Sequence, residues 1–154
     1  GLAEIWFEDT NAMRKLAASP EYKAIQEDEK VFIDSKAVHL IIAEDIITKK
    51  GRRTDKKILV FVKKKAKIDL NVFREKSLGI SFEKVPCKIT RSKISLPKLG
   101  GYKDSKSPQW DAIFTFWVEE RIDQKDIDVL KKSLSGISGR ALSKYCNSII
   151  IQEK

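Results

Sequence analysis

Trp110-Asp111-Ala112-Ile113-Phe114-Thr115-Phe116-Trp117-Val118-Glu119-Glu120 is the most apolar and aromatic stretch of this 154-residue chain. Side chains of a strand alternate between two faces, and this stretch predicts a strand whose faces differ. One face carries Phe114, Phe116 and Val118, is wholly apolar, and is expected to lie under helices. The other carries Ile113, Thr115 and Trp117. Its mixture of large apolar groups with a hydroxyl is more typical of a cavity wall than of a dry core.

The first residues of the chain follow a similar pattern. Ala3, Ile5 and Phe7 alternate there with Leu2, Glu4 and Trp6, and the acidic pair Glu8-Asp9 follows. When Trp6 is aligned with Trp117, Glu4 falls on Thr115 and the acidic pairs coincide. The offset of about 111 residues is the length of a small domain. The pattern therefore predicts an internal repeat, with Ala3, Ile5 and Phe7 under helices and the alternate set facing a cavity or a second sheet.

The charge of the chain is unevenly distributed. Residues 1–50 carry a net charge of −3 and residues 51–154 carry +12, which gives +9 for the chain. Ten Lys or Arg residues lie between Lys49 and Lys67. Such a cluster attracts nucleic acids, but aromatic residues do not alternate with these basic ones as in a platform that stacks bases. We therefore interpret the segment as a solvated linker and strand, and expect weak nucleic-acid binding at most.

The cysteine spacing and the hydropathy bear on the cellular location of the protein. Cys87 and Cys146 are far apart and form no C-x-x-C pair, which favours two reduced thiols and a cytoplasmic location. The sequence contains no apolar run of the length that a membrane helix needs, so we expect no membrane association.

Taken in order, the chain predicts three parts. Residues 1–48 have a β-α-β pattern, with strands from Leu2 to Glu8 and from Ala37 to Ile47. Between these strands Asp9 and Ser19-Pro20 predict two helix starts. Residues 49–56 are polar and basic and predict a linker.

Residues 57–154 have a β-α-β-β-α-β pattern, the ferredoxin-like order. Four strands are expected. The first covers Lys57 to Lys63 and lies in the centre of the sheet, and the second covers Cys87 to Leu96 and is an exposed or edge strand. The third is the aromatic stretch, and the fourth covers Asn147 to Ile151. Its helices are expected from Asp69 and from about Asp123 to Ser135, with Gly136 and Gly139 as stop signals.

This order of elements, together with several short sequence segments, resembles the EthD-type proteins of the dimeric α+β barrel superfamily. The resemblance rests on Gly1 to Asp9, on Leu16-Ala17-Ala18-Ser19-Pro20-Glu21, on Asp28-Glu29 and on Phe32-Ile33-Asp34. It implies an α+β fold of ferredoxin-like repeats, packed sheet to sheet as a dimeric α+β barrel, with a cavity between sheet and helices. The second part resembles the family as a diverged full copy. Relatives often carry a histidine near the position of Lys76 to Gly79, where this chain has none.

Six residues are candidates for a site. Glu4 beside Trp6 is a candidate general acid or base, although a strand glutamate at a solvent-accessible rim is the commoner role. His39, the single histidine of the chain, is a second candidate, although a structural histidine is the commoner role. The expected ligand-binding residues are Trp6, Ile113, Thr115 and Trp117. The sequence holds no metal-binding triad, no phosphate-binding glycine loop and no nucleophile motif, so we expect neither metal nor cofactor.

The sequence favours a protein that binds a small hydrophobic or aromatic molecule, and it leaves open whether the protein is an enzyme. The alternatives are a non-catalytic structural or interaction pseudo-dimer and, less favoured, a nucleic-acid-binding module. Self-association or pairing of the two repeats within the chain is expected. In a ferredoxin-like sheet the first strand lies between the third and the fourth, and residues 1–48 supply only the third and the fourth. We therefore expect a further β-α-β segment before Gly1. Alternatively, another chain supplies this segment, or a strand of the second part takes the place of the missing strand.

Overall fold

The computed structural model describes residues 3–31, 41–98 and 109–147. The chain divides into two compact units, Gly1–His39 and Leu40–Lys154. No helix in the described residues is long and apolar enough to cross a membrane.

The first unit contains two short helices, α1 (Thr10–Ala18) and α2 (Pro20–Glu29). Asp9 caps α1 by accepting a hydrogen bond of 2.7 Å from the backbone N–H of Ala12. Ser19 ends α1 and caps α2 by accepting from the N–H of Tyr22. Pro20 occupies the first turn of α2, where its missing N–H costs nothing. Both predicted helix starts are therefore confirmed.

Residues 3–7 have irregular backbone where the sequence predicts a strand. Ile5 and Phe7 are 65% and 37% exposed, so the prediction that these two side chains lie under helices is wrong. A single strand is not stable without a neighbour that accepts and donates its backbone hydrogen bonds. None of the described strands pairs with this segment, which accounts for the difference.

The second unit is an antiparallel sheet with two helices. Its elements are β1 (Ala43–Lys49), β2 (Lys56–Lys64), α3 (Leu70–Leu78), β3 (Ile89–Pro97), β4 (Ala112–Val118), α4 (Gln124–Leu134) and β5 (Ser138–Asn147). The strands lie in the order β1-β3-β4-β2-β5. From β2 onward this is the ferredoxin-like arrangement, with the first and third strands of the motif in the centre. The α+β class and the central position of β2 are confirmed.

Several strands differ from the prediction in their bounds or in their place in the sheet. β3 is not an edge strand, because β1 pairs with it from Ala43 opposite Pro97 to Lys49 opposite Ser92. β5 begins at Ser138, before the predicted Asn147, and Gly139 lies inside it instead of stopping the preceding helix. A Cβ on Gly139 would lie 3.2 Å from the carbonyl oxygen of Lys64, so glycine lets the two backbones approach closely here.

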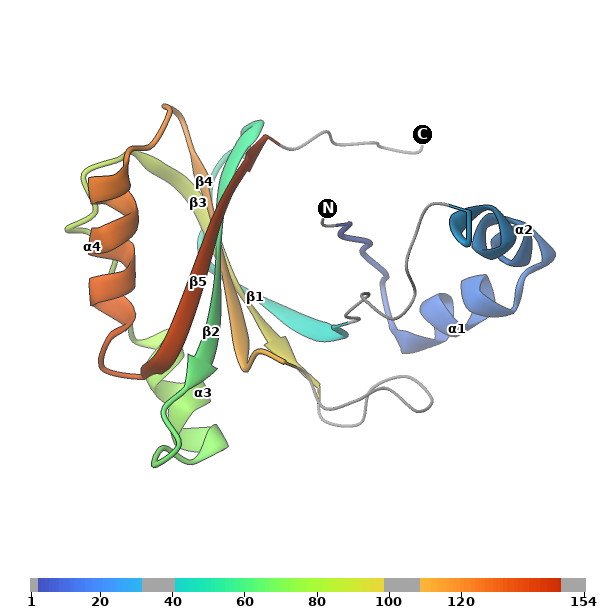
Figure 1. The fold of residues 1–154 in the computed structure, drawn as a ribbon, viewed down its shortest axis with the longest axis horizontal. Coiled ribbons are helices and arrows are strands. Elements are labelled where there is room, and N and C mark those ends of the chain that lie inside the picture. The colour runs from blue at the N-terminus through green and yellow to red at the C-terminus, as the bar shows by residue number, and fades with distance from the viewer. Residues whose placement is uncertain (1–2, 32–40, 99–108, 148–154) are drawn as a thin grey trace. The chain divides into compact units, whose positions relative to one another are not determined.

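The core lies between the sheet and its helices, which cover the same face (Figure 1). Phe114, Phe116 and Val118 are at most 1% exposed and belong to one cluster with Phe73 of α3 and Leu130 of α4. The ring of Phe82 contacts those of Phe114 and Phe116 edge-on, with centroid distances of 5.8 and 4.7 Å. The prediction that Phe114, Phe116 and Val118 lie under helices is therefore confirmed.

Replacing Phe116 by alanine should lower the free energy of unfolding by about 3–5 kcal/mol, because the change leaves a cavity in a packed aromatic cluster. The matched variant Phe7→Ala removes the same ring from a partly exposed position and should cost less than about 1 kcal/mol. Urea unfolding followed by circular dichroism measures both values. Equal losses for the two variants would contradict this description of the core.

Candidate functional site

The face of the sheet that points away from α3 and α4, called the helix-free face below, carries the second set of β4 side chains. Ile113, Thr115 and Trp117 alternate with the core residues and therefore point away from α3 and α4. Strand pairing places Lys93 of β3 opposite Thr115, and Leu59 of β2 opposite it on the other side. Thr115 is fully buried, and Trp117 and Leu59 are 3% and 2% exposed. These residues form a buried patch on the face without helices.

An ion pair and a hydroxyl lie beside this patch. The Lys93 ammonium donates a hydrogen bond of 2.7 Å to one carboxylate oxygen of Asp45. The hydroxyl of Ser95 donates one of 2.6 Å to the other oxygen. The Lys93 side chain is 4% exposed and that of Asp45 is 30% exposed. A buried ammonium needs such a counter-charge, so the pair places two opposite charges, which balance each other, on the strands beside Thr115.

The hydroxyl of Thr115 is unsatisfied. Its oxygen is buried and has no hydrogen-bond partner within the described part of the chain. A hydroxyl can donate one hydrogen bond and accept two, and leaving it unpaired in a protein interior costs about 1–3 kcal/mol. In folded proteins such a group usually bonds another protein group or an ordered water. On this face the Nε of Arg91 is likewise buried and without a partner in the described residues.

Two arginines lie against the ring of Trp117. The guanidinium carbons of Arg53 and Arg91 are each 5.8 Å from the ring centroid, within cation–π range. Arg91 also donates to the carbonyl oxygen of Gly51. A Cβ on Gly51 would lie only 2.0 Å from the carbonyl oxygen of Thr90, so no other residue fits there without a shift. The predicted linker is thus ordered in this part and helps to position the two cations.

The apolar part of the face extends across β2. The rings of Phe61 and Trp110 lie 5.9 Å apart, and the guanidinium of Arg140 lies 5.3 Å from the Trp110 ring. Together with Leu59 and Ile113, these rings give a surface that suits an aromatic or aliphatic group. The helix-free face therefore combines apolar walls, one unsatisfied hydroxyl and fixed positive charge.

Three of the predicted site residues lie together in the second unit. Ile113, Thr115 and Trp117 share one face of β4. Glu4 and Trp6 belong to the first unit, where Trp6 is 50% exposed. His39 lies outside the described residues, so its candidate role stays a prediction.

Sequence reasoning missed Asp45, Lys93 and Ser95. The signal was present in the alternation of Arg91, Lys93 and Ser95 along one strand, which places all three on one face. By itself this alternation predicts only an exposed or edge strand. The pairing of β1 with β3 brings Asp45 to Lys93, and this pairing joins residues 48 apart in the sequence.

Cys87 packs against the helix-side core and does not contribute to this face. Burial, together with the carboxylate of Asp126, raises the pKa of the Cys87 thiol to about 11. At neutral pH Cys87 is therefore a thiol and a poor nucleophile. In the described residues no cluster of three or more His, Cys, Asp or Glu could hold a metal ion.

Comparison with known proteins supports the resemblance seen in the sequence. Residues 1–36 match the model of the EthD domain. The similarity to EthD-type proteins is thus confirmed for this segment, which includes α1 and α2. No curated protein matches the chain.

Among solved structures, the chain is similar to a "putative monooxygenase" from Lactobacillus acidophilus NCFM, with 15% identity and a TM-score of 0.46. The match covers 91% of this chain and 66% of that protein, so the chain spans slightly less than two thirds of its length.

Replacing Asp45 by asparagine should destabilise the protein, because the Lys93 ammonium then loses its carboxylate while it stays buried. We expect a loss of about 2 kcal/mol in the free energy of unfolding, less than for a fully buried pair because Asp45 keeps some contact with water. Adding Lys93→Met to this variant removes the buried charge and should restore most of the loss. Urea unfolding of the single and double variants measures the coupling. A double variant less stable than Asp45→Asn would contradict it.

Proposed function

We propose that this protein binds a small aromatic molecule that carries a hydroxyl or carbonyl oxygen, on the helix-free face of the sheet. The observation that supports this most directly is the buried hydroxyl of Thr115 without a hydrogen-bond partner. A ligand oxygen at this position would satisfy the hydroxyl, and the neighbouring rings and aliphatic groups would contact the apolar part of the ligand.

The charges around Thr115 favour a ligand with electron density on its oxygen. Lys93 lies opposite Thr115, and its ammonium is held by Asp45. The cations of Arg53 and Arg91 lie against Trp117, two residues further along β4. A phenolic oxygen, which becomes more negative when it ionises, is therefore stabilised better than an amine.

The similarities agree with such a function without specifying it. Residues 1–36 match the EthD domain. The arrangement of β2 to β5 is ferredoxin-like, a fold that serves many unrelated functions. Thr115 and its neighbours therefore provide the support for ligand binding.

The test compares 1-naphthol with naphthalene, which has the same rings and no oxygen. Wild-type protein should bind 1-naphthol more tightly, with affinities measured by isothermal titration calorimetry. Thr115→Val keeps the shape of the side chain and removes the hydroxyl. It should weaken the binding of 1-naphthol by about three- to tenfold, the value of one hydrogen bond, and leave that of naphthalene unchanged.

Stability provides the control for Thr115→Val. The variant should unfold at the same or a higher urea concentration, because it buries a methyl group where an unpaired hydroxyl was. Ser133→Ala, which removes a hydroxyl from α4, should change neither affinity, since Ser133 bonds the carbonyl oxygen of Val129 within its own helix. If wild-type protein does not prefer 1-naphthol, or if Thr115→Val keeps the preference, the proposal is wrong.

A further inference from the structure

A hollow of about 320 Å³ lies at the β1 side of the sheet, on the face that carries α3. Its lining residues come from three elements and the segment after β3: Glu44 of β1, Arg74 of α3, Leu96 of β3 and Lys98 just beyond β3. Glu44 and Leu96 are opposite each other in the β1–β3 ladder, and Leu96 belongs to the helix-side core. The hollow is therefore on the opposite face of the sheet from Thr115 and Trp117, and it is separate from the candidate site around Thr115.

Arg74 is fixed at this hollow by one hydrogen bond and left with an unused donor. Its Nη2 donates to the carbonyl oxygen of Pro97 at 2.7 Å, which anchors the guanidinium against the end of β3. Its Nε is buried and has no partner among the described residues. A guanidinium presents its N–H groups as a planar fork that matches the two oxygens of a carboxylate. Arginine carries five N–H donors, and an acceptor in the hollow could bond those that the contact with Pro97 leaves unused.

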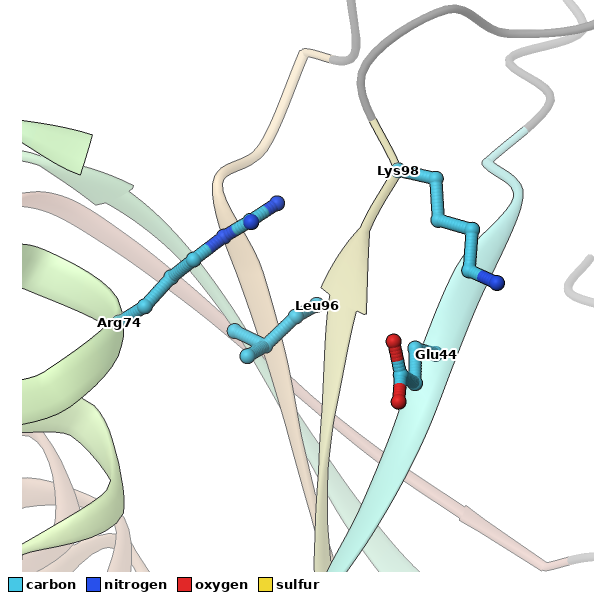
Figure 2. A pocket seen from close by; sticks show the side chains of 4 residues that line it. All are labelled: Glu44, Arg74, Leu96 and Lys98. Atoms are coloured by element: carbon cyan, nitrogen blue, oxygen red, sulfur yellow. The ribbon is translucent and has the colours of Figure 1, made fainter. Parts of the chain in front are cut away.

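The other lining groups define what such an acceptor can be. Figure 2 shows Arg74 on one side of Leu96, and Glu44 and Lys98 on the other. The backbone N–H of Lys98 bonds the carbonyl oxygen of Ile42, which holds the start of that side chain at the β1 edge. Two cations and one carboxylate leave the hollow with an excess of one positive charge, and the Leu96 side chain provides an apolar contact.

We propose that this hollow binds the carboxylate of a small aliphatic acid. Arg74 and Lys98 supply the positive charge, and the aliphatic chain lies against Leu96. Glu44 repels the bound anion and limits the affinity, so its charge opposes binding. Because this site shares no residue with the helix-free face, it stands independently of the function proposed above.

The test uses 4-methylpentanoate and its uncharged analogue 4-methylpentanamide. Nitrogen-15 NMR titration of the full chain follows the backbone amides of residues 74 and 96, which report binding at the hollow directly. Wild-type protein should bind the acid at least about tenfold more tightly than the amide, because the charged partner makes the stronger hydrogen bonds. Arg74→Gln should remove most of this preference.

Two further variants keep the test decisive if Arg74→Gln does not fold. Glu44→Gln removes the repelling carboxylate and should tighten binding of the acid by about two- to fivefold, whereas Lys98→Gln should weaken it by a similar factor. Both residues are exposed, so their replacement leaves the core intact. Lys76→Gln removes a positive charge from the same helix outside the hollow and should change the affinity less than twofold.

Equal affinity for the acid and the amide would overturn the proposal. So would weaker binding of the acid to Glu44→Gln than to wild type. A complete absence of shifts at about 50 mM acid would also overturn it, since a ligand of this size in a matching site should bind at that concentration.

Discussion

The alternation of β4 between two buried faces is the constraint on which the rest of the second unit depends. Phe114 and Phe116 fill the space under the helices, and Thr115 and Trp117 are buried on the opposite face. Because side chains alternate with a period of two, a shift of one residue would exchange the two sets. It would bury a hydroxyl in the aromatic core and leave the helix-free face without its polar group. Packing of the core therefore also determines the position of Thr115.

The pairing of β1 with β3 adds a second constraint, and it is electrostatic as well as structural. β1 covers backbone N–H and C=O groups that β3 would otherwise expose at an edge. It also brings the carboxylate of Asp45 to the ammonium of Lys93, which is 4% exposed. Without that carboxylate, an ammonium so well shielded from water would cost several kcal/mol. The same strand supplies Glu44 to the hollow on the other face.

Features set by neighbouring residues could be predicted from the sequence. The caps at Asp9, Ser19 and Asp69 accept hydrogen bonds from the first turns of their helices, and the apolar run of β2 lies in the centre of the sheet. Features set by long-range pairing could not. The alternation around Trp6 resembles that around Trp117, but only the second segment has strands on both sides. Local pattern therefore identifies which segments are able to form strands, and pairing decides which of them do.

The same distinction between local sequence pattern and long-range pairing applies to the candidate site. The sequence placed Ile113, Thr115 and Trp117 on one face, because alternation is local. It could not show that Thr115 would lack a hydrogen-bond partner, since that depends on side chains from β2 and β3. The hollow at Arg74 was equally out of reach, because its four lining residues lie between positions 44 and 98 and meet only in the folded unit.

The two places differ in how they can select a ligand. At Thr115 the surroundings are dry, so a ligand without an oxygen leaves the hydroxyl unpaired and loses the full value of that hydrogen bond. At the hollow, Glu44 and Lys98 are exposed, and water and salt screen their charges. If both proposals hold, the hollow would distinguish ligands by net charge, and only modestly, while the patch around Thr115 would distinguish them by a single atom. Burial, which removes the competing water, would then make the helix-free face the more selective of the two.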